Sequence, residues 1–130
     1  MLLGQHGADE ASAAGITDPD TIQAVRFYRT SRGHNEYSTN RRLLRGDSLL
    51  LGYDAFHLVD ELLTQPLQVI VAGRRGSTGQ YEAGLKLWSL APNPVDLFIV
   101  EHAGHYEMYD EPTYVDQAIA RMSGFFAENL

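Results

Sequence analysis

The sequence predicts an α/β fold built on a parallel sheet. Two short apolar, β-branched runs, at residues 67–72 and 95–100, have the pattern of strands that are buried on both faces. Helical patterns precede, separate and follow these runs, and strands that alternate with helices are typical of parallel sheets. With 130 residues the chain is one domain by length, so we expect two buried strands and about four helices around one core.

The predicted sheet is too small to stand alone. Buried strands need hydrogen-bond partners on both edges, and two strands by themselves would leave two exposed apolar edges. We therefore expect the chain to be the end of a larger sheet. A partner or a missing amino-terminal half would complete it.

The first predicted element is a helix within residues 17–33. Asp18 is placed as its N-cap, Pro19 occupies its first position, and Gly33 follows its end. Residues 34–48 are predicted to form a loop, because they are rich in Asn, Ser, Thr and Arg. A loop of this length is uncommon in a compact domain and is usually functional or mobile.

Three further helices are predicted. The stretch 53–63 has apolar residues at helical spacing until Pro66 stops it. Residues 80–92 form the helix between the two strands, and residues 111–130 form the last helix, opened by Pro112.

The domain is expected to span residues 17–130. Residues 1–16 show no periodicity and are expected to form a loosely ordered lead-in. They also lack the charged and apolar regions of a signal peptide. No apolar run approaches the roughly 18 residues of a membrane span. We therefore expect a cytoplasmic protein.

Composition narrows the partners and the chemistry. The formal net charge is -7, and no basic cluster is larger than Arg41, Arg42 and Arg45. Counterion release needs many Lys and Arg contacts, so we expect neither nucleic acid nor a membrane as partner. The absence of cysteine excludes disulfides and cysteine-based zinc sites.

Histidines follow the second predicted strand, where sites form in open α/β sheets. Such a residue is well placed to act on a substrate as a general base. His105 is the better candidate, because Gly104 before it allows a tight turn, while His102 lies nearer the strand. Both histidines could also be ordinary polar loop residues.

A metal site is the second interpretation of this loop. It would need His102 and His105 to converge with Glu101, Glu107 or Asp110. Their spacing is loose and matches no helical histidine motif. We therefore expect no metal and no cofactor.

The loop after the first strand offers an anion-binding alternative. Gly73, Gly76 and Gly79, with Arg74 and Arg75 between them, precede a helix whose N–H groups could hold an anion. The glycine spacing matches neither common nucleotide motif. A solvated turn is the competing interpretation.

The stretches "QPLQVIVAG" and "NPVDLFIVEHAGHYEMYDEPTYVDQAIARMSGFF" resemble a known family. They look like the carboxyl-terminal part of the α/β-hydrolase superfamily, in its dienelactone-hydrolase-like branch. The run "GHYEMYDEPTYVDQA" is similar to the turn that carries the triad histidine and leads into the last helix of that branch. The resemblance covers roughly residues 20–128.

The resemblance implies a role for His105 as the base of a serine hydrolase triad. The family's acid would lie in the loop after the penultimate strand, near Ser77, but that loop has no Asp and Glu82 is the nearest carboxylate. No serine meets the Gly-x-Ser-x-Gly pattern of the nucleophile. Ser77 comes closest, in "RGSTG", yet too few elements separate it from His105 for the family's order.

The expected function is that of an α/β-hydrolase-like half domain. The family chemistry would be serine-dependent hydrolysis of an ester, lactone or other acyl bond, with His105 as general base. Without a nucleophile elbow or oxyanion hole the isolated chain should be inactive. A small-molecule substrate and either a homo-oligomer or a complementing amino-terminal chain are the expected partners. The alternative is a non-catalytic binding or interaction module derived from the hydrolase fold.

Overall fold

A computed structural model describes residues 9, 12–38 and 43–130. The lead-in predicted for residues 1–16 falls largely outside them, as do Arg41 and Arg42 of the basic cluster.

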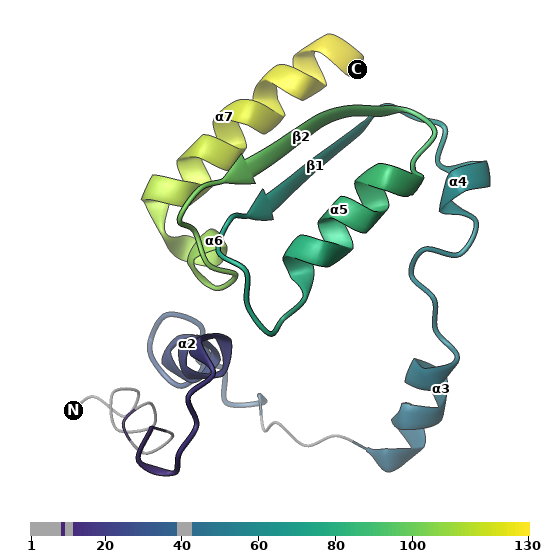
Figure 1. The fold of residues 1–130 in the computed structure, drawn as a ribbon. Coiled ribbons are helices and arrows are strands. Elements are labelled where there is room, and N and C mark those ends of the chain that lie inside the picture. Colours follow the sequence, from purple (N-terminus) through teal and green to yellow (C-terminus); the bar gives the residue numbers. More distant parts are fainter. Residues whose placement is uncertain (1–8, 10–11, 39–42) are drawn as a thin grey trace.

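The centre of the molecule is a three-layer α/β arrangement (Figure 1). Strands β1 (Leu67–Ala72) and β2 (Pro94–Val100) pair in parallel, and α5 (Gln80–Leu90) joins them. Helix α5 covers one face of the sheet and α7 (Pro112–Asn129) covers the other. The predicted α/β fold with a parallel sheet is therefore confirmed for the described part of the chain.

The outer edge of β1 has no strand beside it among the described residues. The N–H groups of Leu67 and Gly73 donate to the Asn93 and Val100 carbonyls at the β2 side. Parallel strands alternate their bonding direction, so every second residue of β1 faces away from β2. We call these the outer-edge residues: Gln68, Ile70 and Ala72. The inner-edge residues are Val69, Val71 and Gly73.

The core of the chain is small for its size. Its buried apolar residues are few and are mostly small: Val69, Val71, Ala72, Ala91, Val100 and Ala103. The chain exposes 9413 Å², whereas a folded monomer of this mass exposes about 6,900 Å². The excess of about 2,500 Å² is the size of a large protein interface.

Helix α2 (Pro19–Tyr28) begins as predicted. Its N-cap is Asp18, whose carboxylate accepts from Thr21 N–H at 2.8 Å. The helix ends at Tyr28, before residue 33. The chain then turns back, and the Gly33 N–H donates to the Phe27 carbonyl at 3.1 Å.

The helix predicted over 53–63 is wrong in extent. Only α4 (Val59–Leu62) is helical, and the residue before it, Leu58, has a left-handed conformation with φ of 58°. Leu62 is 68% exposed, so the apolar side of this stretch does not pack on the sheet. Without that packing, helical periodicity alone does not hold a long helix.

The loop predicted over 34–48 is also shorter than expected. It gives way to a 3₁₀ turn, η1 (Leu44–Gly46), and to helix α3 (Asp47–Leu51). A further short helix, α6 (Glu107–Asp110), forms inside the histidine-containing loop predicted after the second strand.

The glycine inside α5 brings this helix close to the sheet. A Cβ atom at Gly84 would lie 2.3 Å from Val71 Cγ1 and 3.3 Å from Val69 Cγ1. Contacts under 3 Å force the strand or the helix to move.

We expect Gly84→Ala to destabilise the chain although alanine favours helices. The overpacking cost of about 1–3 kcal/mol should exceed the helix-propensity gain of about 1 kcal/mol. Gly124→Ala in α7 is the matched control, because its Cβ meets nothing within 4 Å. That variant should gain about 0.5–1 kcal/mol. Urea unfolding at low protein concentration measures both, and equal effects would refute the close approach.

Candidate functional site around His105

His105 is held at the carboxyl end of the sheet. Strand β2 ends at Val100, and both Val100 and Ala103 are fully buried, which anchors the loop on the core. His102 turns the chain with a positive φ of 65° and points its side chain to the exposed surface. His105 follows, half-buried, just before α6.

The His105 ring is hydrogen-bonded to a tyrosine one helical turn away. Its Nε2 lies 2.8 Å from the hydroxyl oxygen of Tyr109. The same two rings are in edge contact with centroids 5.1 Å apart, and Tyr106 makes a second edge contact at 4.9 Å. These contacts fix the orientation of the imidazole.

The two tyrosines belong to an aromatic cluster between α2 and α6. The Phe27 ring lies 5.1 Å from Tyr109, and Tyr28 lies 5.9 Å from Tyr106. Burial raises the pKa of Tyr106 and the pKa of Tyr109, and the neighbouring Tyr28 raises both further. Both phenols therefore stay protonated near neutral pH.

The His105 loop is tied to the loop after β1. The Glu107 carboxylate accepts from the Gly104 N–H at 2.7 Å and from Arg74 Nη2 at 3.0 Å. The Arg74 N–H donates to the Ala103 carbonyl at 2.9 Å. Gly104 leaves room for the guanidinium, because a Cβ there would lie 2.0 Å from Arg74 Nη2.

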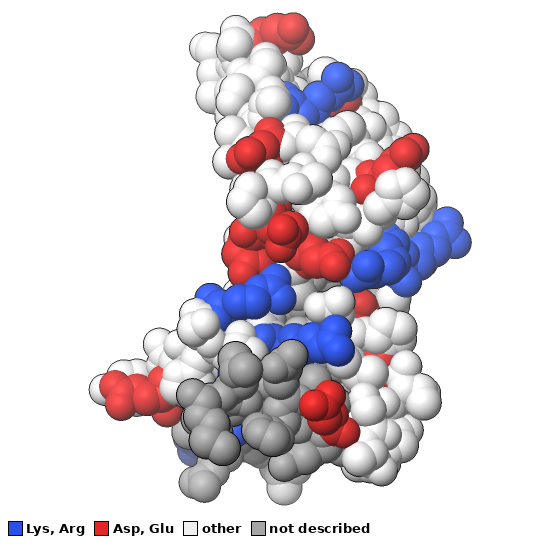
Figure 2. Space-filling model, turned by 90° about the vertical axis from the view of Figure 1, so that its left-hand side faces the viewer, with Lys and Arg blue, Asp and Glu red and all other residues white. Residues whose placement is uncertain are grey.

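A second ion pair connects α6 to the segment after α2. Arg32 binds Asp110 through two parallel hydrogen bonds, Nε to Oδ2 at 2.8 Å and Nη2 to Oδ1 at 2.5 Å. The Arg32 guanidinium lowers the pKa of Asp110, and the Asp110 carboxylate raises the pKa of Arg32. Figure 2 shows the face of the molecule that includes α7 and α2. Acidic and basic side chains lie next to one another in the middle of this face.

The glycine-rich loop after β1 binds a carboxylate of the same chain, the side chain of Asp20. The Thr78 N–H donates to the Asp20 carboxylate at 3.0 Å, and Asp20 is only 5% exposed. A Cβ at Gly76 would lie 2.0 Å from Asp20 Oδ2. In the loop of Gly73, Gly76 and Gly79, for which anion binding was one interpretation, the Asp20 carboxylate from α2 thus occupies the space beside Gly76.

Ser77 and Glu82 have partners other than His105. The Ser77 hydroxyl donates to Asp18 Oδ2 at 2.7 Å, which together with Thr21 lowers the pKa of Asp18. Glu82 lies 3.8 Å from Arg75 Nε on the exposed first turn of α5. No hydrogen bond or ion pair among the described residues joins either side chain to His105.

A cavity of about 510 Å³ lies beside the aromatic cluster. Its lining residues come from α2, from the segment after it and from the residue next to His105: Ala24, Val25, Tyr28, Arg29, Ser38 and Tyr106. This volume lies within the range of about 300–1,000 Å³ that is usual for small-molecule sites.

The described residues include no group of three or more His, Asp or Glu side chains that could hold a metal ion. Within the same part of the chain, no helix is long and apolar enough to cross a membrane.

Sequence reasoning missed the residues that surround His105. Tyr109 was given no role, although a histidine and a tyrosine four residues apart meet on a helix. Here His105 lies in the turn just before α6, so helical spacing within α6 alone would not have identified the pair. Glu107 lies at the start of α6 and Arg74 lies in the loop after β1, 33 residues away in sequence, so local sequence patterns carry no sign of their contact.

Comparison with known proteins gives one informative match. No known protein family profile matches the chain. The chain is 32% identical over 109 residues to "Uncharacterized protein YcjY" of Escherichia coli (strain K12), which covers 83% of this chain and 35% of the relative. The chain thus spans about a third of the length of the curated relative it matches. YcjY contains much polypeptide beyond the part that is similar to this chain.

Proposed function

We propose that the chain is the carboxyl-terminal portion of an α/β-hydrolase-like domain and supplies the base of a serine hydrolase. The observation that carries the proposal is the position of His105. Its imidazole is oriented at the carboxyl end of a parallel strand, with Nε2 in a 2.8 Å hydrogen bond to a hydroxyl group. In the tautomer that carries its proton on Nδ1, Nε2 accepts from Tyr109 and is the atom that would take a proton from a serine hydroxyl.

The remaining parts of the site would come from polypeptide outside these 130 residues. They are the serine on its elbow, the oxyanion hole and at least one strand beside β1. The unpaired outer edge of β1, the exposed area and the greater length of YcjY support this view. The 130 residues alone are therefore expected to be inactive.

The proposed chemistry is hydrolysis of an ester, lactone or related acyl bond. The serine oxygen attacks the acyl carbon while its proton moves to His105 Nε2, and the same proton then passes to the leaving oxygen. Water releases the acyl group in a second round, with His105 again as base. Tyr109 must release Nε2 before a serine can use it, because both hydroxyls need the same nitrogen.

A non-catalytic binding module is the second candidate. The observation that favours it is the absence of a carboxylate bonded to His105 among the described residues. Glu82 pairs with Arg75, and Glu107 binds Gly104 N–H and Arg74. The cavity beside Tyr106 could then bind a small molecule without chemistry.

A chimera separates the two candidates. The part of YcjY that is similar to this chain is replaced by residues of this chain, and the product is assayed with p-nitrophenyl esters and a fluorophosphonate label. Ester turnover with labelling of a serine would support the hydrolase. If neither the chimera nor YcjY itself turns over any ester or takes the label, the hydrolase proposal fails.

A further inference from the structure

The segment from Leu43 to Tyr53 projects from the body as an apolar arm. We call it the leucine arm. It comprises η1 and α3, which follow each other directly in the chain, and α3 lies apart from the sheet and its covering helices (Figure 1). Its large side chains are all exposed, by 60% to 89%: Leu43, Leu44, Leu49, Leu50, Leu51 and Tyr53.

So many neighbouring apolar side chains are unusual on a free surface. Contiguous apolar patches of this kind mark interaction sites or aggregation hazards. The arm also carries one exposed cation, Arg45, which makes no ion pair with any described residue. Its chemistry therefore suits a recess with apolar walls and an acidic rim.

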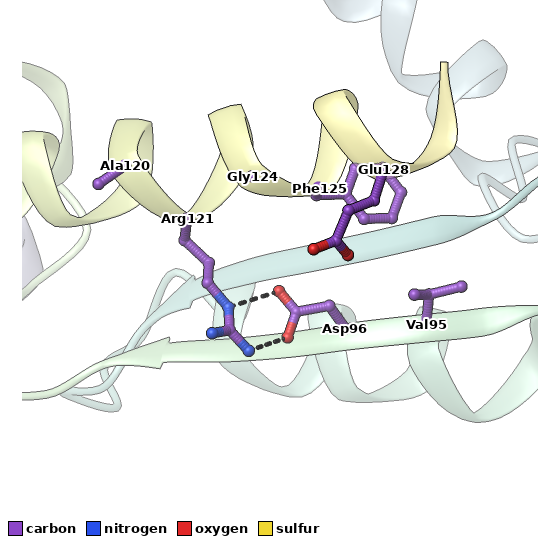
Figure 3. A pocket seen from close by; sticks show the side chains of 7 residues that line it. All are labelled: Val95, Asp96, Ala120, Arg121, Gly124, Phe125 and Glu128. Atoms are coloured by element: carbon purple, nitrogen blue, oxygen red, sulfur yellow. Dashed lines mark hydrogen bonds and ion pairs between the residues drawn. The ribbon is translucent and has the colours of Figure 1, made fainter.

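The chain itself contains such a recess, between α7 and the start of β2 (Figure 3). Its volume is about 340 Å³. Val95 and Phe125 supply apolar walls, and Gly124 leaves the wall open because nothing lies within 4 Å of its Cβ position. The Glu128 carboxylate points into the recess from the last turn of α7.

The other charges of the recess are already neutralised. Arg121 binds Asp96 by two hydrogen bonds, Nε to Oδ2 at 2.8 Å and Nη2 to Oδ1 at 2.5 Å, as Figure 3 shows. Gln68 Nε2 adds a third bond to Asp96 at 2.7 Å. Glu128 also attracts the Arg121 guanidinium electrostatically, but it forms no hydrogen bond or ion pair with a described residue, and its charge is opposite in sign to that of Arg45.

We propose that the leucine arm of one copy docks in the α7–β2 recess of a second copy. Each chain carries both complementary surfaces. In a two-fold dimer, each copy would insert its arm into the recess of the other, so that both arms and both recesses are occupied. A specific interface needs about 800 Å² from each partner. The area that the chain exposes beyond that of a compact monomer, about 2,500 Å², is larger than this requirement.

Sedimentation equilibrium of the 130-residue chain tests the proposal. The wild type should sediment at twice 14.5 kDa. Leu50→Asp combined with Leu51→Asp should raise the dimer dissociation constant more than about tenfold, as expected for central apolar contacts. The control is Leu62→Asp, a leucine that is 68% exposed in α4 and should leave the dimer intact.

Charge reversal tests the orientation of the arm. Arg45→Glu and Glu128→Lys should each weaken the dimer about tenfold, and the two together in one chain should restore it. A wild type that stays monomeric up to about 1 mM overturns the proposal. So does a dimer that is indifferent to the arm variants, or an open-ended series of larger species. Circular dichroism confirms that each variant is folded, since all the altered side chains are exposed.

Discussion

Val100→Asp is expected to unfold the chain. Val100 has no exposed surface and contacts Ala72 and Ala103 at the centre of the core cluster. An unpaired carboxylate there would cost at least about 4 kcal/mol, because no described partner can neutralise it. A core as small as this one has little stability to lose.

The matched control lies on the same strand. Val95 is 47% exposed, so Val95→Asp should change the free energy of unfolding by no more than about 1 kcal/mol. Thermal unfolding followed by circular dichroism measures both variants. A cooperative transition of Val100→Asp close to that of the wild type would show that the core is not where the structure places it.

If the YcjY chimera hydrolyses esters as proposed, His105→Asn is expected to abolish that activity. Asparagine keeps a polar side chain of similar size but cannot take the serine proton. Loss of the triad base costs about 10⁴-fold or more in kcat. The substrate KM should change little, because the base acts on the nucleophile and not on ground-state binding.

His102→Asn is the matched control for this prediction. His102 is exposed and has a left-handed φ of 65°, which asparagine tolerates well. Activity should stay within a few-fold of the parent chimera. If both variants keep full activity, His105 is not the base. If His102→Asn alone is inactive, the wrong histidine has been assigned.

The central layers of the fold could be predicted from the sequence. The apolar runs at β1 and β2 predict buried strands, and the helical patterns between and after them predict α5 and α7. By helix propensity alone, Gly84 is unfavourable inside a helix. The structure explains why a glycine lies there, since the missing Cβ lets α5 approach Val71.

The elements away from the sheet were less predictable. The apolar spacing of 53–63 resembles that of a packed helix, but no sheet lies beneath it, and only Val59–Leu62 becomes helical. The α6 helix is only four residues long, which is too short for periodicity to reveal.

The candidate site could be predicted only in part. The strand-end position and Gly104 indicated His105, and the structure places it at that end. The glycine-rich loop was interpreted either as an anion-binding loop or as a solvated turn, and neither interpretation included the carboxylate of Asp20, which is 58 residues from Thr78 in sequence. A contact at that separation depends on the whole fold, so no local pattern predicts it.

The proposed function requires a sheet that is unfinished at the outer edge of β1. Hydrogen exchange of the β1 amides tests it most directly. In the 130-residue chain the inner-edge residues should exchange at least about tenfold more slowly than the outer-edge residues. In the YcjY chimera both sets should be protected, because a further strand then pairs with β1. If the outer-edge residues Gln68, Ile70 and Ala72 are as protected as their neighbours in the isolated chain, the edge is already covered and the proposed function is contradicted.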